Sequence, residues 1–329
     1  MRYRKLGNTG LKVSEVSFGG GAVGGLMTDN EREEEHFRVV RRALELGITH
    51  FDTASSYGDG RSESNLGRAL EKLEAEVTLS TKVRLGADRP GDIAGAVVAS
   101  VEESLARLRR KSVDLIQLHD HVAPEGQWGD ISITPEEVLD PGGVVDGFKI
   151  LKDKGKVRFF GFTGLGRPES LHVLVMSGML HSIQVYYNLL NPTAAYPAPA
   201  GYEPLDYGGL LLKAAEQGMG IFAIRVLARG ALVASPKTGG KEPRSLSPGS
   251  GYSRDVERGQ KLAWLAEAET CSLSQAAFRF ALMRPEISAA LAGCASVAEV
   301  EETVACSGAP GLSEASVERL AGLWASDFA

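Results

Sequence analysis

Residues 48–57 combine an apolar segment with two side chains that can take part in proton transfer. Asp52 closes the apolar segment, and Tyr57 follows five residues later in a loop that contains Gly58 and Gly60. A phenol in water gives up its proton only near pH 10, so a tyrosine that acts as acid or base near neutral pH needs a neighbouring cation. The segment therefore predicts a proton-transfer site if the fold brings a cation to it.

The chain offers such a cation at the end of a second apolar segment, which closes with Lys82, while a third closes with His119. Each residue also has an ordinary interpretation when taken singly. The aspartate could cap the strand end, the tyrosine could be a loop aromatic, and the lysine could be a solvated surface residue. His119 could begin a polar loop or form a metal pair with His121. We expect no metal site, because adjacent side chains diverge at a strand end and no ligand cluster is evident on a third strand.

The elements that would position these residues are eight short apolar segments with the character of strands. Most are separated by segments whose apolar residues recur at helical spacing, and strands that alternate with helices imply a parallel sheet. Eight such units in about 300 residues are typical of a closed (β/α)8 barrel of the α/β class, whose catalytic residues gather at the carboxyl ends of its strands. The eight segments are residues 16–18, 48–51, 77–82, 113–119, 159–163, 183–186, 221–224 and 289–293.

Capping signals and glycines place several other elements. Residues 31–46 have the pattern of a helix, and Thr134, Pro135 and Glu137 form a capping-box start for a helix that would end at residues 152–155. Residues 2–13 predict a β-hairpin that would plug the bottom of the barrel. We expect one domain over residues 1–329, with the hairpin in residues 1–13 and the barrel and C-terminal helices in residues 14–329.

Three long connections follow strands on the same face of the predicted barrel. They span residues 121–133, 191–209 and 234–253. Long loops in compact domains are usually functional or disordered. We expect them to cover a cofactor and a substrate, although residues 234–253 could also be a disordered solvated tether.

The four polar residues resemble, in order and spacing, those of the aldo-keto reductase family. The resemblance runs from residues 3–7, similar to the family's opening hairpin, to residues 293–296, similar to its adenosine-binding segment. It implies an NAD(P)-dependent oxidoreductase that transfers hydride between a nicotinamide and a carbonyl carbon. Tyr57 would exchange the proton of the substrate oxygen, Lys82 would favour the tyrosinate, Asp52 would pair with Lys82, and His119 would orient the substrate oxygen.

The resemblance also implies a cofactor groove, in which this chain departs from the family at several positions. Gly164 stands where the family often has an asparagine and loses an amide contact, while Ile224 replaces an aromatic platform. Arg225 replaces a serine, which suggests a less usual contact to the pyrophosphate or to the substrate. The matched positions are Gly20, Gly21, Asp52, Thr163, Gly164, Gln184, Arg225, Leu227, Gly293, Ala295, Ser296, Glu299 and Glu302.

Two of these positions bear on the choice of nucleotide. Many family members that prefer NADP carry a cation where this chain has Ala295, and arginine or glutamine where it has Glu299. Those side chains clamp the ribose 2′-phosphate, for which the donor fork of arginine is suited. A methyl group and an anion in their place predict a preference for NAD(H) over NADP(H).

The substrate pocket is expected to contain Tyr57, His119 and Trp128, the last in a loop rich in glycine and proline. Residues 161–165 and 287–304 look similar to the aldose and L-galactose dehydrogenase branch of the family, which favours a sugar or polyol. The expected partner is thus a small carbonyl or sugar molecule.

Two alternatives stay open. Gly19, Gly21 and Gly24 satisfy the G-x-G-x-x-G pattern of a Rossmann unit, but residues 26–30 intervene before the helix, and Asp52 lies farther on than the roughly 20 residues expected. Some barrels of the family are accessory subunits of ion channels that keep the cofactor site. The intact tetrad does not exclude that role, although nothing here resembles the extended N-terminal segment of such subunits.

Composition excludes several other classes of function. The net charge of −6 does not fit a nucleic-acid footprint, and no apolar run reaches the roughly 18 residues of a membrane span. Residues 1–15 show no secretory signal. Three cysteines without C-x-x-C spacing are typical of reduced thiols, so we expect a cytoplasmic protein.

Overall fold

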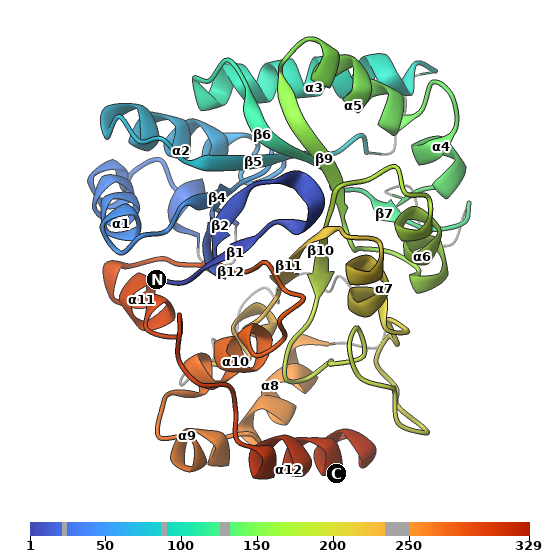
Figure 1. Cartoon of the computed structure of the whole chain (residues 1–329). Helices are drawn as coiled ribbons and strands as arrows, with labels where there is room; N and C mark the ends of the chain where they lie inside the picture. Colours follow the sequence, from blue (N-terminus) through green and yellow to red (C-terminus); the bar gives the residue numbers. More distant parts are fainter. Residues whose placement is uncertain (22–24, 87–90, 126–131, 234–250) are drawn as a thin grey trace.

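A barrel of parallel strands forms the centre of the molecule (Figure 1). The computed structural model describes residues 1–21, 25–86, 91–125, 132–233 and 251–329. Within these ranges eight strands close into a ring in the order β10-β11-β12-β3-β4-β5-β6-β9. They are β3 (Val16–Gly19), β4 (His50–Asp52), β5 (Thr78–Val83), β6 (Val113–Leu118), β9 (Val157–Thr163), β10 (Ser182–Tyr186), β11 (Gly220–Ile224) and β12 (Ala289–Gly293). The predicted (β/α)8 barrel is confirmed, and no predicted strand limit differs from the observed one by more than two residues.

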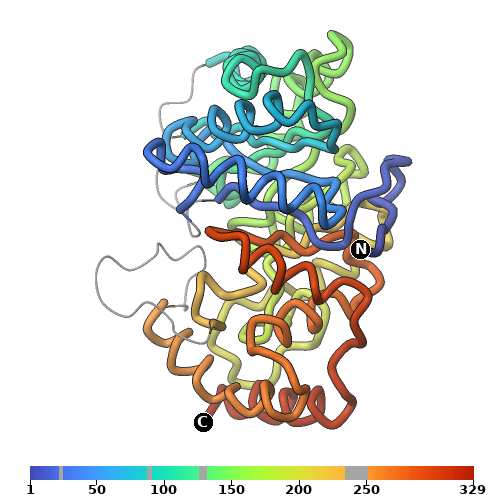
Figure 2. The backbone as a smooth tube through the Cα atoms, turned by 90° about the vertical axis from the view of Figure 1, so that its left-hand side faces the viewer, coloured from blue at the N-terminus to red at the C-terminus, as the bar shows by residue number. Residues whose placement is uncertain are grey.

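Helices surround the ring, and the views of Figures 1 and 2 show them outside the strands along the barrel axis. The apolar faces of the helices pack with the outward-facing residues of the strands into one continuous core. The described helices are α1 (Glu33–Glu45), α2 (Arg61–Lys72), α3 (Ile93–Leu108), α4 (Pro135–Leu139), α5 (Val144–Asp153), α6 (Pro168–Met176), α7 (Leu210–Glu216), α8 (Tyr252–Gln260), α9 (Trp264–Ala268), α10 (Leu273–Leu282), α11 (Val297–Val304) and α12 (Glu314–Ala325).

The N-terminal hairpin closes one end of the barrel, as the sequence predicted. Strands β1 (Tyr3–Lys5) and β2 (Lys12–Ser14) pair in antiparallel fashion and cross the open end of the ring in Figure 1. Leu6 and Val13 are fully buried against Phe222 of β11 and its neighbours inside the barrel. The hairpin thus covers the end of the barrel opposite the carboxyl ends of the strands.

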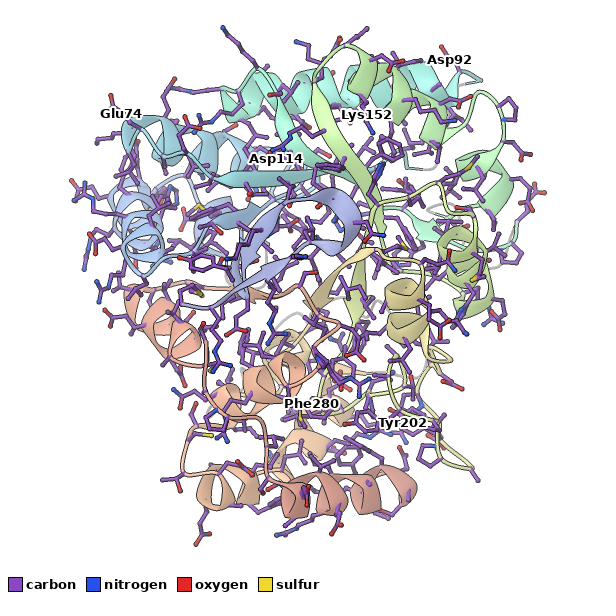
Figure 3. The ribbon with its side chains drawn as sticks, in the orientation of Figure 1. Glu74, Asp92, Asp114, Lys152, Tyr202 and Phe280 are labelled. Atoms are coloured by element: carbon purple, nitrogen blue, oxygen red, sulfur yellow. The ribbon has the colours of Figure 1, made fainter. Side chains whose placement is uncertain are left out.

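The C-terminal helices extend the core to one side of the barrel. Phe280 of α10 is labelled in Figure 3. Its ring stacks on that of Tyr187 with centroids 5.0 Å apart, and the ring centroid of Trp324 of α12 lies 5.9 Å from that of Phe280. Trp324 Nε1 also donates a 2.8 Å hydrogen bond to the carbonyl of Leu189. These contacts anchor α12 to the segment that follows β10.

Two predictions about helices and loops need correction. The helix expected from Thr134 to residues 152–155 is two helices, α4 and α5. The capping box of Thr134 and Glu137 is present, but Pro141 cannot continue the helix and Gly142 has a positive φ of 82°. The loop predicted over residues 234–253 ends earlier, because α8 begins at Tyr252.

The Rossmann alternative is wrong. The strand before the glycines, β3, is a member of the closed barrel, and a 3-10 helix at Leu26–Thr28 separates it from α1. No helix in the described part of the chain is long and apolar enough to cross a membrane.

Two smaller strands, β7 (His121–Val122) and β8 (Ser132–Ile133), pair in parallel between β6 and α4. They occupy the ends of the first long connection, and residues 126–131 between them lie outside the described ranges, as do residues 234–250 of the third. The second long connection, residues 191–209, is described and contains neither a helix nor a strand.

Candidate active site

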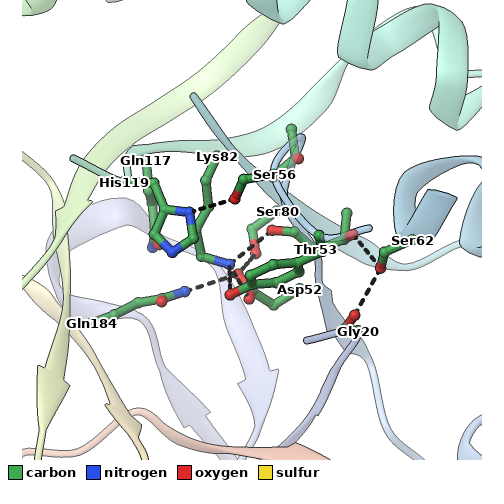
Figure 4. A network of polar contacts seen from close by, with 12 residues as sticks. Gly20, Asp52, Thr53, Ser56, Ser62, Ser80, Lys82, Gln117, His119 and Gln184 are labelled. Atoms are coloured by element: carbon green, nitrogen blue, oxygen red, sulfur yellow. Dashed lines mark hydrogen bonds and ion pairs between the residues drawn. The ribbon is translucent and has the colours of Figure 1, made fainter. Parts of the chain in front are cut away.

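The ion pair of Asp52 and Lys82 lies at the end of the barrel opposite the hairpin. Asp52 closes β4, Lys82 is the last residue but one of neighbouring β5, and both side chains point into the barrel. Lys82 Nζ donates to Asp52 Oδ2, and both side chains are buried. A buried charge is stable only when it is paired and hydrogen-bonded. Figure 4 shows this pair at the centre of a polar network.

The second oxygen of the Asp52 carboxylate accepts two further hydrogen bonds. Ser80 Oγ donates to Oδ1 at 2.6 Å, and Gln184 Nε2 donates to the same oxygen at 2.8 Å. Ser80 precedes Lys82 by two residues, so strand alternation places both on the inner face of β5. Three donors thus hold the carboxylate in one orientation.

Lys82 joins the ion pair to the phenol of Tyr57. Its Nζ donates to the carbonyl of Thr53 at 2.8 Å and lies 3.4 Å from Tyr57 Oη and 4.8 Å from the centroid of that ring. Burial acts to lower the pKa of Lys82, but attraction to Asp52 and Tyr57 outweighs it, so its pKa is raised. Lys82 therefore stays a cation beside the phenol.

His119 follows β6 and faces the phenol from the other side. The rings of Tyr57 and His119 meet edge to face, with centroids 5.5 Å apart. Burial, followed by the charges of Lys82 and other cations, holds the pKa of His119 well below its usual value of 6.5, so the imidazole is neutral at pH 7. Ser56 Oγ lies 3.2 Å from Nδ1. If this hydroxyl donates, the ring carries its proton on Nε2 and can donate to a ligand.

The glycines expected near the cofactor lie beside this cluster. Gly21 lies next to the ring of Tyr57: a Cβ atom added to this glycine would stand 3.8 Å from the nearest ring carbons. A Cβ atom added to Gly20 would stand only 2.6 Å from Ser62 Oγ. The N–H of Gly20 donates to the carbonyl of Asp52 at 2.7 Å. The absence of side chains thus lets this loop run close to Asp52 and Tyr57.

Thr163 ends β9 on the same face of the barrel, and Gly164 follows it. The hydroxyl of Thr163 is buried and has no hydrogen-bond partner among the described residues, while Gly164 N donates to the carbonyl of Gln184 at 2.7 Å. A buried hydroxyl without a partner is uncommon in a folded protein. Thr163 is therefore available for a polar ligand in the site.

The segment after β11 has an unusual backbone. Arg225, Ala228 and Arg229 all have positive φ, at 58°, 45° and 64°. Such conformations cost about 1 to 3 kcal/mol each in non-glycine residues and cluster at functional sites. Ile224 ends the strand and Leu227 is half-buried within this segment, so both lie on the same rim as the tetrad.

The residues expected around adenosine form a separate group at the end of β12. Gly293 pairs in register with Gly19 of β3, which brings this segment beside the glycine loop. Ser296 caps α11 by accepting from Glu299 N at 3.3 Å, and Glu299 Oε2 accepts from Ala295 N at 2.7 Å. Glu302 accepts from Ser272 Oγ, the N-cap of α10, so it also holds two helices together.

The structure thus brings the four predicted catalytic residues together and adds two that the sequence did not single out, Ser80 and Ser56. Ser80 could have been found by strand alternation from Lys82. Ser56 gives no such signal because its place depends on the loop. Gln184 was expected to contact a nicotinamide, and here it donates to Asp52. Trp128, expected in the substrate pocket, lies outside the described residues.

Comparison with known proteins agrees with this geometry. The model of the family described as "Aldo/keto reductase family" matches residues 15–325. The L-galactose dehydrogenase of Arabidopsis thaliana is 31% identical over 313 residues, which cover 93% of this chain and 88% of that protein.

Solved structures share the fold. An aldo-keto reductase of Bacillus halodurans in its holo form has a TM-score of 0.72 at 24% identity, covering 98% of this chain and 96% of that one. An aldo-keto reductase of Klebsiella pneumoniae in complex with NADPH has a TM-score of 0.70 at 19% identity, covering 99% and 96%.

Proposed function

The chain belongs to the aldo/keto reductase family, and we propose that Asp52, Tyr57, Lys82 and His119 carry out that family's reaction in it. The reaction is the NAD(P)-dependent interconversion of a carbonyl compound and an alcohol. The observation that supports this assignment is the contact of Tyr57 Oη with the buried cation of Lys82 at 3.4 Å, with His119 on the other side of the ring.

Each side chain has a distinct task in this scheme. Tyr57 gives a proton to the carbonyl oxygen in reduction and removes it in oxidation. Lys82 stabilises the tyrosinate that results, because its ammonium group is held as a cation beside the phenol. Asp52 keeps Lys82 in place and balances its charge in the dry interior. Neutral His119 donates from Nε2 to the substrate oxygen and orients it.

The described residues suit a nicotinamide nucleotide, which supplies the hydride when bound. The partnerless hydroxyl of Thr163 and the amide of Gln184 would hold the carboxamide of the nicotinamide. The side-chain-free stretch at Gly20 and Gly21 leaves room beside Tyr57. The rim at Gly293 and the capped N-terminus of α11 would receive the adenosine end.

The preference for NAD(H) that the sequence predicted is not supported by the comparisons, since the Klebsiella pneumoniae structure holds NADPH. The local chemistry still opposes a 2′-phosphate. Glu299 places a carboxylate 2.7 Å from Ala295 N at the start of α11, where a cation would be needed. We propose that NAD(P)(H) is the cofactor. The relative that holds NADPH favours NADP(H), and Glu299 would weaken, without preventing, the binding of its 2′-phosphate.

The proposed substrate class is a sugar or a related polyhydroxy carbonyl compound. Similarity to the L-galactose dehydrogenase of Arabidopsis thaliana over 93% of the chain supports it. A test is a panel of aldoses, polyols and simple aldehydes, assayed in both directions with NAD(H) and NADP(H). Turnover of a sugar that disappears in Tyr57→Phe supports the proposal. Absence of any cofactor-dependent turnover, with the nucleotide bound, would instead favour a binding protein of the same fold.

A further inference from the structure

The buried and partly buried arginines of the described part of the chain differ in whether their guanidinium groups are paired with a carboxylate. Arg229 is paired with Asp255 at 2.7 Å, and Arg258 is paired with Asp327. In contrast, Arg84 and Arg225 are partly buried at the open end of the barrel, and neither guanidinium has a hydrogen bond or ion pair with any residue in the described ranges. Buried charges are normally paired, so these two cations need an explanation.

Arg225 follows the last residue of β11 and is held there by its backbone. Its carbonyl accepts from Asn188 Nδ2 at 3.0 Å and from Ala228 N at 2.8 Å, and its φ is 58°. Burial is the main reason that the pKa of the Arg225 guanidinium is lowered, and the phenol of Tyr57 is the strongest of the groups that oppose this lowering. A strained and anchored backbone thus presents a positive charge to the catalytic phenol.

Arg84 reaches the same region from the other side. It lies two residues after Lys82, just beyond β5, and strands β5 and β11 are separated by three strands in either direction around the ring. They are therefore opposite each other. His119 lies after β6, next to β5, and after burial and the charge of Lys82 both arginines contribute to lowering its pKa. The two arginines thus follow strands on opposite sides of the end of the barrel that also carries Tyr57 and His119.

Among the residues that the structure describes, no carboxylate forms an ion pair with either arginine. Asp52 is taken by Lys82, Ser80 and Gln184. Asp120 accepts from the backbone N–H groups of Leu85 and Gly86 at 2.9 and 3.0 Å, so its oxygens hold the loop after β5. The mouth of the barrel is thus locally cationic in a chain whose net charge is −6.

We propose that Arg84 and Arg225 bind an anionic group of the carbonyl substrate, a carboxylate or a phosphate. This rests on the function proposed above and narrows it to sugar acids, sugar phosphates and similar oxo compounds. Guanidinium groups match the geometry of both anions through paired donors. The anion anchors one end of the substrate, and the carbonyl oxygen then lies between Tyr57 and His119.

The pyrophosphate of the cofactor offers the same chemistry, so the experiment separates the two sources. The probes are matched pairs: succinic semialdehyde against butanal, and glyceraldehyde 3-phosphate against glyceraldehyde. For each pair the quantity is the ratio of kcat/KM for the anionic and neutral members. It is measured for the wild type, Arg84→Gln, Arg225→Gln and the control Arg158→Gln. Arg158 is the second residue of β9, at the hairpin end, and is exposed, so its loss changes the net charge equally without touching the open end of the barrel.

The wild type should favour the anionic member of at least one pair. Arg225→Gln and Arg84→Gln should each lower that ratio by about 10- to 100-fold, the effect of one hydrogen bond to a charged group. Arg158→Gln should leave it within about twofold, because exposed charges at a distance are screened. If the ratio of kcat/KM for the anionic and neutral members is the same in Arg84→Gln, Arg225→Gln and Arg158→Gln, the proposal is overturned. An unchanged ratio accompanied by weaker Kd values for NADH and NADPH alike would also overturn it, since the arginines would then serve the pyrophosphate.

A titration of the wild-type complex with cofactor covers the case in which the variants do not fold. Succinate, which cannot be reduced at a carbonyl, should bind by calorimetry and should inhibit the reduction of butanal competitively. Absence of binding at about 50 mM, well beyond a millimolar Kd, contradicts the proposal. A protein that turns over neutral carbonyls but ignores succinate keeps the proposed function and loses this inference. A protein that turns over nothing loses the proposed function itself.

Discussion

Gln184 and Asp52 lie on opposite strands of the barrel, β10 and β4, and are joined by a 2.8 Å hydrogen bond from Nε2 to Oδ1. The bond crosses the interior of the barrel. It joins Gln184, which contacts the nicotinamide in our proposal, to the ion pair of Asp52 and Lys82. Because the donor holds a carboxylate that also binds Lys82, the position of the catalytic cation depends on a residue across the ring.

Gln184→Leu should destabilise the fold, because it removes one of the three donors of a buried carboxylate. Hydrogen bonds to charged groups contribute about 1.5 to 3 kcal/mol. The free energy of unfolding, measured with urea, should fall by that amount, whereas Gln260→Leu, an exposed glutamine at the end of α8, should have little effect. Equal stability of the two variants would mean that this bond does not hold Asp52.

Lys82→Met should shift the pH dependence of kcat or abolish activity. The positive charge beside the phenol favours the tyrosinate, so without it the change in kcat should occur at higher pH. The measurement is kcat against pH in both reaction directions. Lys111→Met, an exposed lysine that precedes β6 at the hairpin end, is the control. An unchanged profile in Lys82→Met would remove this lysine from the mechanism.

His50 makes a third prediction, which concerns stability at acid pH. Burial is the main reason that the pKa of His50 is lowered from 6.5 to about 4, and its ring stacks on Phe222 with centroids 4.6 Å apart. The unfolded chain takes up this proton at a higher pH than the folded one. Stability is therefore lost as the pH falls below 6.5 toward 4, on the order of 2 kcal/mol by pH 5.

His50→Gln keeps a donor for Ser80 Oγ, which lies 3.1 Å from Nε2, but cannot take up the proton. Its free energy of unfolding should therefore fall less than that of the wild type between pH 7 and pH 5. Parallel losses in the two proteins would show that His50 does not titrate in this interval.

Ala295→Arg combined with Glu299→Arg should raise the affinity for NADPH relative to NADH. The change replaces a methyl group and an anion at the start of α11 by two cations that can hold a 2′-phosphate. The measurement is the ratio of Kd values by direct titration. Glu301→Arg, a charge reversal on the face of α11 that contacts Arg42, is the matched control. A ratio that moves equally in both variants would point to a long-range effect of charge.

The positions of three catalytic residues at or just after strand ends explain how much of the site the sequence could predict. Asp52, Lys82 and His119 each end or follow an apolar segment, and a closed parallel barrel brings such ends together. The bond between Gln184 and Asp52 could not be predicted, because it depends on which strands face each other after closure. The contact of Ser56 with His119 depends on a loop conformation that has no periodic pattern.

The sequence contains a signal for the break between α4 and α5, although the capping pattern predicted one continuous helix. Residues 140–143 are Asp-Pro-Gly-Gly, a strong turn signal, but the capping box and the cations at the far end suggested one helix. In contrast, the lack of a partner for Arg84 and Arg225 among the described residues becomes visible only from the three-dimensional positions of the carboxylates in those ranges.

The most direct test of the central claim is the turnover of Tyr57→Phe with a carbonyl substrate, together with its Kd for NADPH and NADH. The substitution removes only the hydroxyl that lies 3.4 Å from Lys82 Nζ and leaves the ring beside His119. We predict that kcat falls by about 10²- to 10⁴-fold, the usual contribution of a general acid or base, while both Kd values stay within about twofold. Turnover close to that of the wild type would contradict the assignment of Tyr57 as the proton donor.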